Sequence, residues 1–301
     1  MKQILKRALR RTGRLLGLEE SLSQAVSQTV NQAVSQVDKS RDSCASRLSQ
    51  LLMVEQYRAL ARSKAPLPDF ADVEFRAFSQ NGEDGILLYL FALLGAGRRR
   101  ALEICASNGI QCNAANLVVN HGWEALLMDG DAAHISQGNA FYANHPDTFS
   151  FPPRFVHAWI TRENVNQAVR EGGFEGEIDL LSLDIDGNDY WIWEALNVVS
   201  PRVVVAEIQC IWGADRAVTV PYHPEFRAGF VNGFGVIRVQ ACLLLSGWPL
   251  ARAIGSWGFN GLASTHFSCA MVWVKNSFRR WNRQIASICH LSVGPSRICC
   301  R

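Results

Sequence analysis

Apolar residues follow two different rhythms along the chain, and the change falls near residue 77. Before it, Leu22, Val26, Val30, Ala33 and Val37 recur at spacings of four and three. That spacing places them on one face of a helix. After it, short apolar runs are separated by segments with a helical pattern. Buried strands that alternate with helices are typical of a parallel sheet covered on both faces.

The second rhythm predicts a Rossmann-like α/β fold with a mostly parallel sheet. The expected strands are 100–107, 123–129, 155–161, 178–185 and 202–208. The expected helices are 79–95, 111–120, 163–171 and 190–196. We therefore predict three parts, which are a helical extension over 1–69 that ends in a Pro-containing linker, an α/β core over 70–228, and a tail over 229–301.

Residues 2–17 form a basic amphipathic helix candidate that contains no acid. Peripheral contact with an anionic membrane surface and a simply solvated basic helix are both open interpretations. The apolar stripe within residues 18–62 predicts either weak self-association as a coiled coil or packing on the main domain.

Composition narrows the class of protein. The net charge of +3 argues against a specific nucleic-acid binder. The nine cysteines include no closely spaced pair of the zinc-site type, so we expect no structural metal and a reducing, cytoplasmic environment. Neither a signal peptide nor an apolar stretch long enough to cross a membrane is present in the sequence.

Two strand ends carry residues suited to a nucleoside-like ligand, because ligands of such sheets bind at the carboxyl ends of the strands. The first is EICASNG, which contains Glu103 and a turn of small residues that allows close approach of backbone to ligand; the candidate contacts in this turn are Ala106, Ser107 and Gly109. The second is LLMDGD, where Asp129 is placed to accept both hydroxyls of a ribose. Capping of the following helix is the alternative role of Asp129.

A third strand end, LSLDIDGNDYW, gathers unusual negative charge. Asp184 and Asp186 are candidate catalytic residues that would orient an acceptor hydroxyl or bind a divalent cation. Glu207 ends the next strand and is expected to face the same cleft. Asn188 and Asp189 are the candidates for capping the helix that follows.

The order of these motifs resembles the FkbM-type group of class I S-adenosylmethionine-dependent methyltransferases. The matching segments are SQNGEDG, EICASNGIQCNAANL, HGWEALLMDGD, IDLLSLDIDGNDYWIW and PRVVVAEI. The resemblance implies S-adenosylmethionine as cofactor, with Glu103 and the turn to Gly109 beside its methionine part and Asp129 at its ribose. It also implies that Asp184–Gly187 lies near the reacting centre and that the acceptor is a glycan or another small-molecule hydroxyl. Cys105 and Ala106 depart from the glycines that the wider class prefers.

The tail differs from the rest of the chain. No Asp or Glu follows Glu225, although the chain contains 27 acids. The motifs that close such a methyltransferase sheet are not found there, and we expect the closing strands to be missing. The neighbouring reading frame permits GASL, GYRLVG and NAFFVR in the expected order, which suggests a one-base shift between Glu225 and Val236. A genuine cationic tail that binds a membrane or nucleic acid is the alternative interpretation.

Other residues leave their roles open at this stage. The candidate bases are His121, His145, His157 and His223, and the candidate core or cleft aromatics are Trp191, Trp193 and Trp212. Methyl transfer is the favoured function. An inactive scaffold that acts through its N-terminal helices and a non-functional frameshift product are the alternatives.

Overall fold

The computed structural model describes residues 46–209, 219–227, 229–231, 234–237, 257–263 and 268–275. The chain divides into two compact units, Met1–Ser49 and Gln50–Arg301. The basic segment 2–17 and all five residues of the apolar stripe, which lie within 22–37, are outside the described residues. No helix in the described part of the chain is long and apolar enough to cross a membrane.

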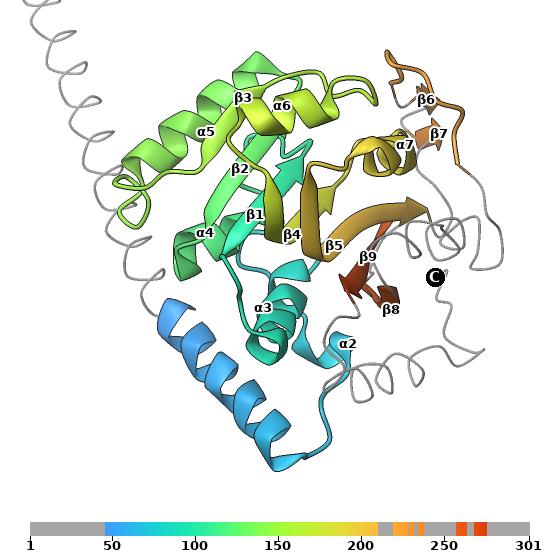
Figure 1. The fold of residues 1–301 in the computed structure, drawn as a ribbon. Helices are drawn as coiled ribbons and strands as arrows, with labels where there is room; N and C mark the ends of the chain where they lie inside the picture. The colour runs from blue at the N-terminus through green and yellow to red at the C-terminus, as the bar shows by residue number, and fades with distance from the viewer. Residues whose placement is uncertain are drawn as a thin grey trace, which may run out of the picture. The chain divides into compact units, whose positions relative to one another are not determined.

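The second unit alternates helices and strands (Figure 1). Residues 50–63 are helical. The helices that follow are α2 (Phe70–Val73), α3 (Glu83–Leu94), α4 (Ala115–His121), α5 (Ala132–Asn144), α6 (Val165–Glu171) and α7 (Asp189–Ala195). The strands are β1 (Arg100–Ile104), β2 (Glu124–Asp129), β3 (Arg154–His157), β4 (Gly176–Leu183), β5 (Val199–Gln209), β6 (Gly229–Val231), β7 (Phe234–Ile237), β8 (Trp257–Ala263) and β9 (Ser268–Lys275).

The main sheet has the strand order β3-β2-β1-β4-β5-β9-β8. Strands β1 to β5 are parallel to their neighbours, β9 pairs antiparallel with β5, and β8 pairs antiparallel with β9. The order reverses between β1 and β4, because the chain moves outward from β1 to β3 and then returns to the other side. The fold is therefore the Rossmann-like, mostly parallel α/β arrangement that the sequence predicts, and its ligand position is the carboxyl end of β1, β2 and β4.

The prediction that the closing strands are missing is wrong. Strand β9 pairs with β5 from Val203↔Val274 to Gln209↔Ser268, and β8 completes the sheet beside it. The prediction depended on finding particular closing motifs. Sheet pairing, however, uses backbone hydrogen bonds, and the run AMVWV at 270–274 is rich in residues that favour strands.

Alternation along the strands divides the core into two clusters, one on each face of the sheet. In β5, Val203 and Val205 join the cluster that contains α3 and α4, whereas Val204 and Ala206 join the cluster that contains α6 and α7. Every residue of α3 is buried. Both faces of the parallel strands are thus covered by helices, which explains why these strands are apolar throughout.

The amino ends of the strands are joined by a buried ion pair. Arg202 donates a hydrogen bond of 2.5 Å to Asp179, and the same carboxylate accepts the backbone amides of Gly97 and Arg99 at 2.8 and 2.6 Å. Arg202 also donates to the carbonyl oxygens of Leu94 and Gly95 at the end of α3. These bonds connect α3, β4 and β5 at the end of the sheet opposite to the candidate site.

Candidate functional site

The turn after β1 is held in an uncommon backbone conformation. Cys105, Ser107 and Gly109 have positive φ angles of 66°, 51° and 68°. The Ala106 amide donates to the carbonyl oxygen of Met128 at 2.9 Å, and the Ser107 amide donates to Asp129 Oδ2 at 2.8 Å. Left-handed conformations at residues other than glycine persist only where the surroundings impose them. Here the hydrogen bonds to the end of β2 supply that constraint.

Glu103 is buried below this turn, and the chain itself uses both of its oxygens. Oε1 accepts from the Asn113 amide at 3.0 Å and from Ser182 Oγ at 3.1 Å, and Oε2 accepts from the Ala114 amide at 2.7 Å. Burial raises the pKa of Glu103, and these hydrogen bonds oppose the rise. The side chain thereby fixes the start of α4 to β1 and β4.

Asp129 joins the turns that follow β1 and β2. Besides Ser107, it accepts the Asp131 amide at 2.8 Å, and its Oδ1 lies 3.2 Å from Nδ1 of His134. Its side chain is 8% exposed. The capping alternative for Asp129 is wrong, because Asp131 is the N-cap of α5 and accepts the Ala133 amide at 2.7 Å.

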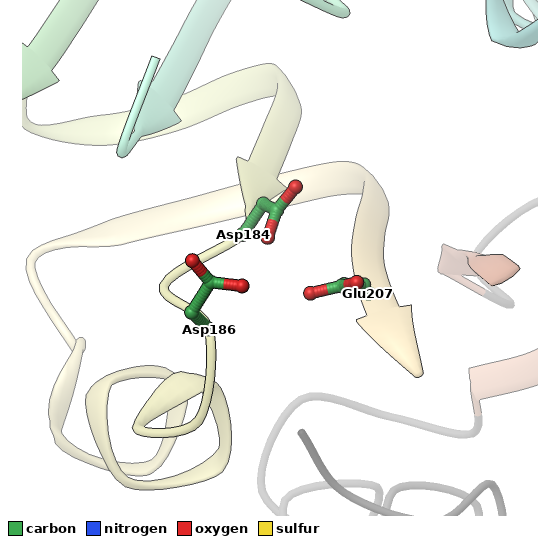
Figure 2. Close-up of side chains that lie close together, drawn as sticks. All are labelled: Asp184, Asp186 and Glu207. Atoms are coloured by element: carbon green, nitrogen blue, oxygen red, sulfur yellow. The ribbon is translucent and has the colours of Figure 1, made fainter. Parts of the chain in front are cut away.

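Three carboxyl groups meet across the ends of β4 and β5. The ligand oxygens of Asp184, Asp186 and Glu207 all lie within 4.8 Å of one another, and Figure 2 shows the three groups gathered around one space. Asp186 has a positive φ of 57° and Gly187 one of 147°. Three oxygens this close together are able to bind a hard divalent cation or to accept hydrogen bonds from hydroxyl groups.

Burial and the neighbouring negative charge favour the protonated form of two carboxyl groups at this end of the sheet, Glu207 and Asp189. Burial, followed by the charge of Asp184 and a hydrogen bond with it, raises the pKa of Glu207 far above its usual range. Burial and the charge of Asp184 also raise the pKa of Asp189 to about 7. Close carboxyl groups with unfavourable solvation share protons rather than ionise together. Glu207 is therefore expected to carry a proton at neutral pH.

Asp189 has a structural role in the turn between β4 and α7. Its oxygens accept the amides of Ile185 at 2.8 Å and Gly187 at 3.0 Å. Asn188 occupies the N-cap position of α7 but makes no capping hydrogen bond with its side chain. The sequence predicted that Asn188 or Asp189 caps α7. Instead, the Asp189 carboxylate accepts the amides of the turn that precedes the helix.

The structure separates the four histidines proposed as bases. His121 contacts Gln50, His145 lies 3.9 Å from Asp147, and the Nδ1 of His223 accepts the Glu225 amide. Only His157 reaches the Asp129 turn, through the carbonyl oxygen of Gly130 at 3.2 Å. Sequence reasoning missed His134, which contacts Asp129. The sequence could have indicated His134, because it lies in the first turn of a helix that begins directly after the acidic end of β2.

Two of the three aromatic candidates, Trp191 and Trp193, lie in α7. Trp191 and Trp193 are partly buried and pack against the cluster around α6 and α7, in agreement with a core role. Trp191 also donates to the carbonyl oxygen of Val220 at 2.9 Å. Trp212 lies outside the described residues.

No family model matches the chain, and no curated protein matches it. Among solved structures, the N-terminal domain of EvdMO1 with S-adenosylhomocysteine bound is 14% identical, covers 70% of this chain and 85% of that chain, and has a TM-score of 0.44. Magnesium protoporphyrin IX methyltransferase (ChlM) from Synechocystis PCC 6803 is 13% identical, with coverages of 64% and 78% and a TM-score of 0.41. The glycopeptide N-methyltransferase MtfA is 11% identical, with coverages of 68% and 94% and a TM-score of 0.40.

Proposed function

We propose that this chain is an S-adenosylmethionine-dependent methyltransferase of the FkbM type that methylates a hydroxyl group. The observation that carries the proposal is the hydrogen bond between Asp129 and the turn Cys105–Gly109. It brings a carboxylate at the end of β2 beside a strained turn of small residues after β1, and β1 is one of the two strands between which the strand order reverses. A ligand with an anionic or polar group and a ribose fits these two elements together.

The cofactor-binding residues in this proposal are Ala106, Ser107, Gly109 and Asp129 as contacts, and Glu103 as the residue that supports them. The residues of the turn contribute small side chains and backbone groups. Asp129 contributes carboxylate oxygens for the ribose hydroxyls. Glu103 acts from below, because its hydrogen bonds to Asn113 and Ala114 hold the start of α4 in place.

Asp184 and Asp186 are the proposed catalytic residues, with Glu207 as a third member of the group. The bound cofactor supplies an electrophilic methyl group. Transfer of that methyl group to the acceptor oxygen would break its bond to the cofactor sulfur and release S-adenosylhomocysteine, and the hydroxyl proton must leave as well. A carboxylate of the group accepts this proton, or the three acids bind a cation that orients the acceptor. A glycan suits such a group because its adjacent hydroxyls donate several hydrogen bonds to carboxylates.

Isothermal titration calorimetry with S-adenosylmethionine tests the proposal directly. We expect saturable heat in the micromolar range. Absence of heat at high micromolar cofactor would exclude the enzyme function for this chain. Transfer of labelled methyl groups to a panel of monosaccharides and glycolipids, with Mg²⁺ or with EDTA, then identifies the acceptor class and separates the proton-acceptor role from the cation role.

A second candidate is a product without catalytic function, and the absence of acids after Glu225 favours it. Sequencing of the source DNA across codons 220–240 tests the proposed one-base shift. An unshifted sequence removes the shift hypothesis. A scaffold role through residues 18–62 predicts crosslinked oligomers of the full chain, and peripheral contact through residues 2–17 in the cytoplasm predicts cosedimentation with anionic vesicles.

A further inference from the structure

Residues 219–227, here called the strap, are bound to three separate elements at the carboxyl side of the sheet. Trp191 of α7 donates to the carbonyl oxygen of Val220 at 2.9 Å. The Asn188 side chain donates to the carbonyl oxygen of His223 at 2.9 Å. Trp159, which follows β3, donates to the carbonyl oxygen of Pro224 at 2.7 Å. Each of these side chains donates to a backbone carbonyl oxygen of the strap. These hydrogen bonds fix the path of the strap over the sheet.

Phe226 lies directly on the backbone of the turn that contains Asp186. A Cβ atom added to Gly187 would be 2.4 Å from Cε1 of Phe226. No side chain fits between the ring and this turn, and Gly187 also has a φ of 147°. The ring therefore occupies the space that a larger residue at position 187 would need.

The turn from Ile185 to Asn188 is held from two sides. Asp189 accepts the amides of Ile185 and Gly187 on one side. Phe226 and the carbonyl oxygen of His223 contact the turn from the strap. Asp186 needs such support because its φ of 57° is unfavourable for a residue with a side chain.

The strap also reaches the other candidate turn through Trp159. A Cβ atom at Gly130 would be 2.9 Å from the Trp159 ring, and the Arg227 guanidinium lies 4.7 Å from a ring centroid of the same indole. Gly130 directly follows Asp129. The strap thus contacts, through one tryptophan and one phenylalanine, the turns that carry both halves of the proposed site.

We infer that the strap is a positioning element and that Phe226 is its principal positioning residue. It holds the 185–188 turn so that Asp186 stays turned toward Asp184 and Glu207. The consequence for catalysis rests on the proposed methyl transfer. The consequence for the conformation of the turn does not, because it follows from packing alone.

Hydrogen exchange of the full chain tests the positioning role without cofactor or acceptor. In Phe226→Ala we expect the amides within 183–190 to exchange about tenfold faster. Phe226→Leu keeps most of the apolar volume and should show a smaller increase in the exchange rate. It replaces Phe226→Ala as the test if Phe226→Ala does not fold. The matched control is Glu225→Ala, an exposed position of the same strap. Unchanged exchange of 183–190 in both Phe226 variants would overturn the inference.

A double-mutant cycle tests the contact itself. Gly187→Ala should lower the melting temperature strongly when Phe226 is present and less strongly in the Phe226→Ala background, because the steric conflict is then removed. The unfavourable φ of Gly187 applies in both backgrounds and cancels in the comparison. Equal decreases in both backgrounds would overturn the proposed contact.

Activity measurements connect the strap to the proposed function. Phe226→Ala should reduce kcat for methyl transfer at least tenfold while the Kd for S-adenosylmethionine changes less than twofold, and Phe226→Leu should restore part of kcat. A parallel loss of cofactor affinity would overturn the role at the acid group. Failure of the wild-type chain to bind the cofactor would instead refute the proposed function, and the exchange result would still decide the conformational role.

Discussion

The backbone amide of Ser107 donates a hydrogen bond of 2.8 Å to the carboxylate of Asp129. This bond connects the turns after two adjacent parallel strands, and the Asp131 amide bonds to the same carboxylate. The two turns are therefore one hydrogen-bonded unit. Asp129 maintains the shape of the site as well as offering oxygens to a ligand.

Asp129→Ala should weaken S-adenosylmethionine binding at least tenfold and also destabilise the fold. The amides of Ser107 and Asp131 lose their acceptor, which costs about 1–3 kcal/mol for each group that stays buried. Calorimetric titration and urea unfolding measure the two effects separately. Asp131→Asn is the control, since asparagine keeps the capping of α5. Unaltered cofactor affinity in Asp129→Ala would show that the cofactor placement is wrong.

Asp189 predicts a pH dependence of stability. Its pKa is raised to about 7 in the folded chain, so the folded state binds this proton more tightly than the unfolded state. The stabilisation is complete below the unfolded pKa of about 4 and is lost as pH rises to about 7. Asp189→Asn lacks this titration, so its stability deficit relative to wild type should shrink between pH 5 and pH 8 by on the order of 2 kcal/mol.

Urea unfolding at the two pH values measures this difference. The proton shared around Glu207 and Asp184 is present in both proteins and largely cancels. A deficit that stays constant or grows with pH would contradict a raised pKa at Asp189.

The buried pair of Asp179 and Arg202 should matter for stability and not for the cofactor. The Asp179 side chain is 0% exposed and that of Arg202 is 10% exposed. Asp179→Ala leaves a buried guanidinium without its carboxylate, which costs about 3–5 kcal/mol. The exposed pair of Arg170 and Glu175 is the matched comparison, and Glu175→Ala should cost less than about 1 kcal/mol. Similar losses of stability in Asp179→Ala and Glu175→Ala would mean that the buried pair contributes no more to stability than the exposed pair.

Replacement of Cys105 by glycine and replacement of Ala106 by glycine should change the free energy of unfolding in opposite directions. Cys105 has a φ of 66°, so Cys105→Gly relieves backbone strain and should raise the free energy of unfolding by about 0.5 kcal/mol. Ala106 is buried and is not among the positive-φ residues, so Ala106→Gly should lower it by about 1 kcal/mol. Thermal unfolding of the wild type and of both variants measures the two changes. Destabilisation by Cys105→Gly would indicate that the side chain contributes packing that outweighs the strain.

Apolar periodicity predicted the elements in which apolar residues are concentrated, and β3 is among them although its four residues are exposed or only partly buried. The five parallel strands and helix α3 follow directly from it, and the acids Asp129, Asp184 and Asp186 were located because they end such strands. Helix α5 was not predicted, since among its residues only Gly138 and Tyr142 are buried and its surface is polar. Its Asp131 cap was the available signal.

Two features of the site depend on contacts distant in sequence. The strap has no regular pattern, and its place follows from Phe226 on Gly187 and from Pro224 bonded to Trp159. The partnership of Glu207 with Asp184 was anticipated only as a shared cleft. The raised pKa of Glu207 depends on its burial, and the sequence alone does not predict that burial.

The pairing of β9 along β5 has a consequence for shortened forms of the chain. Seven residue pairs, from Val203 to Gln209, use the outer edge of β5. A product that ends before residue 257 would present that edge with its amides and carbonyls unpaired, on a strand whose side chains are mostly apolar. Such an edge recruits strands from other molecules. Whatever the origin of the acid-free segment, its strands β9 and β8 cover the edge of β5, so that the sheet ends at β8 instead.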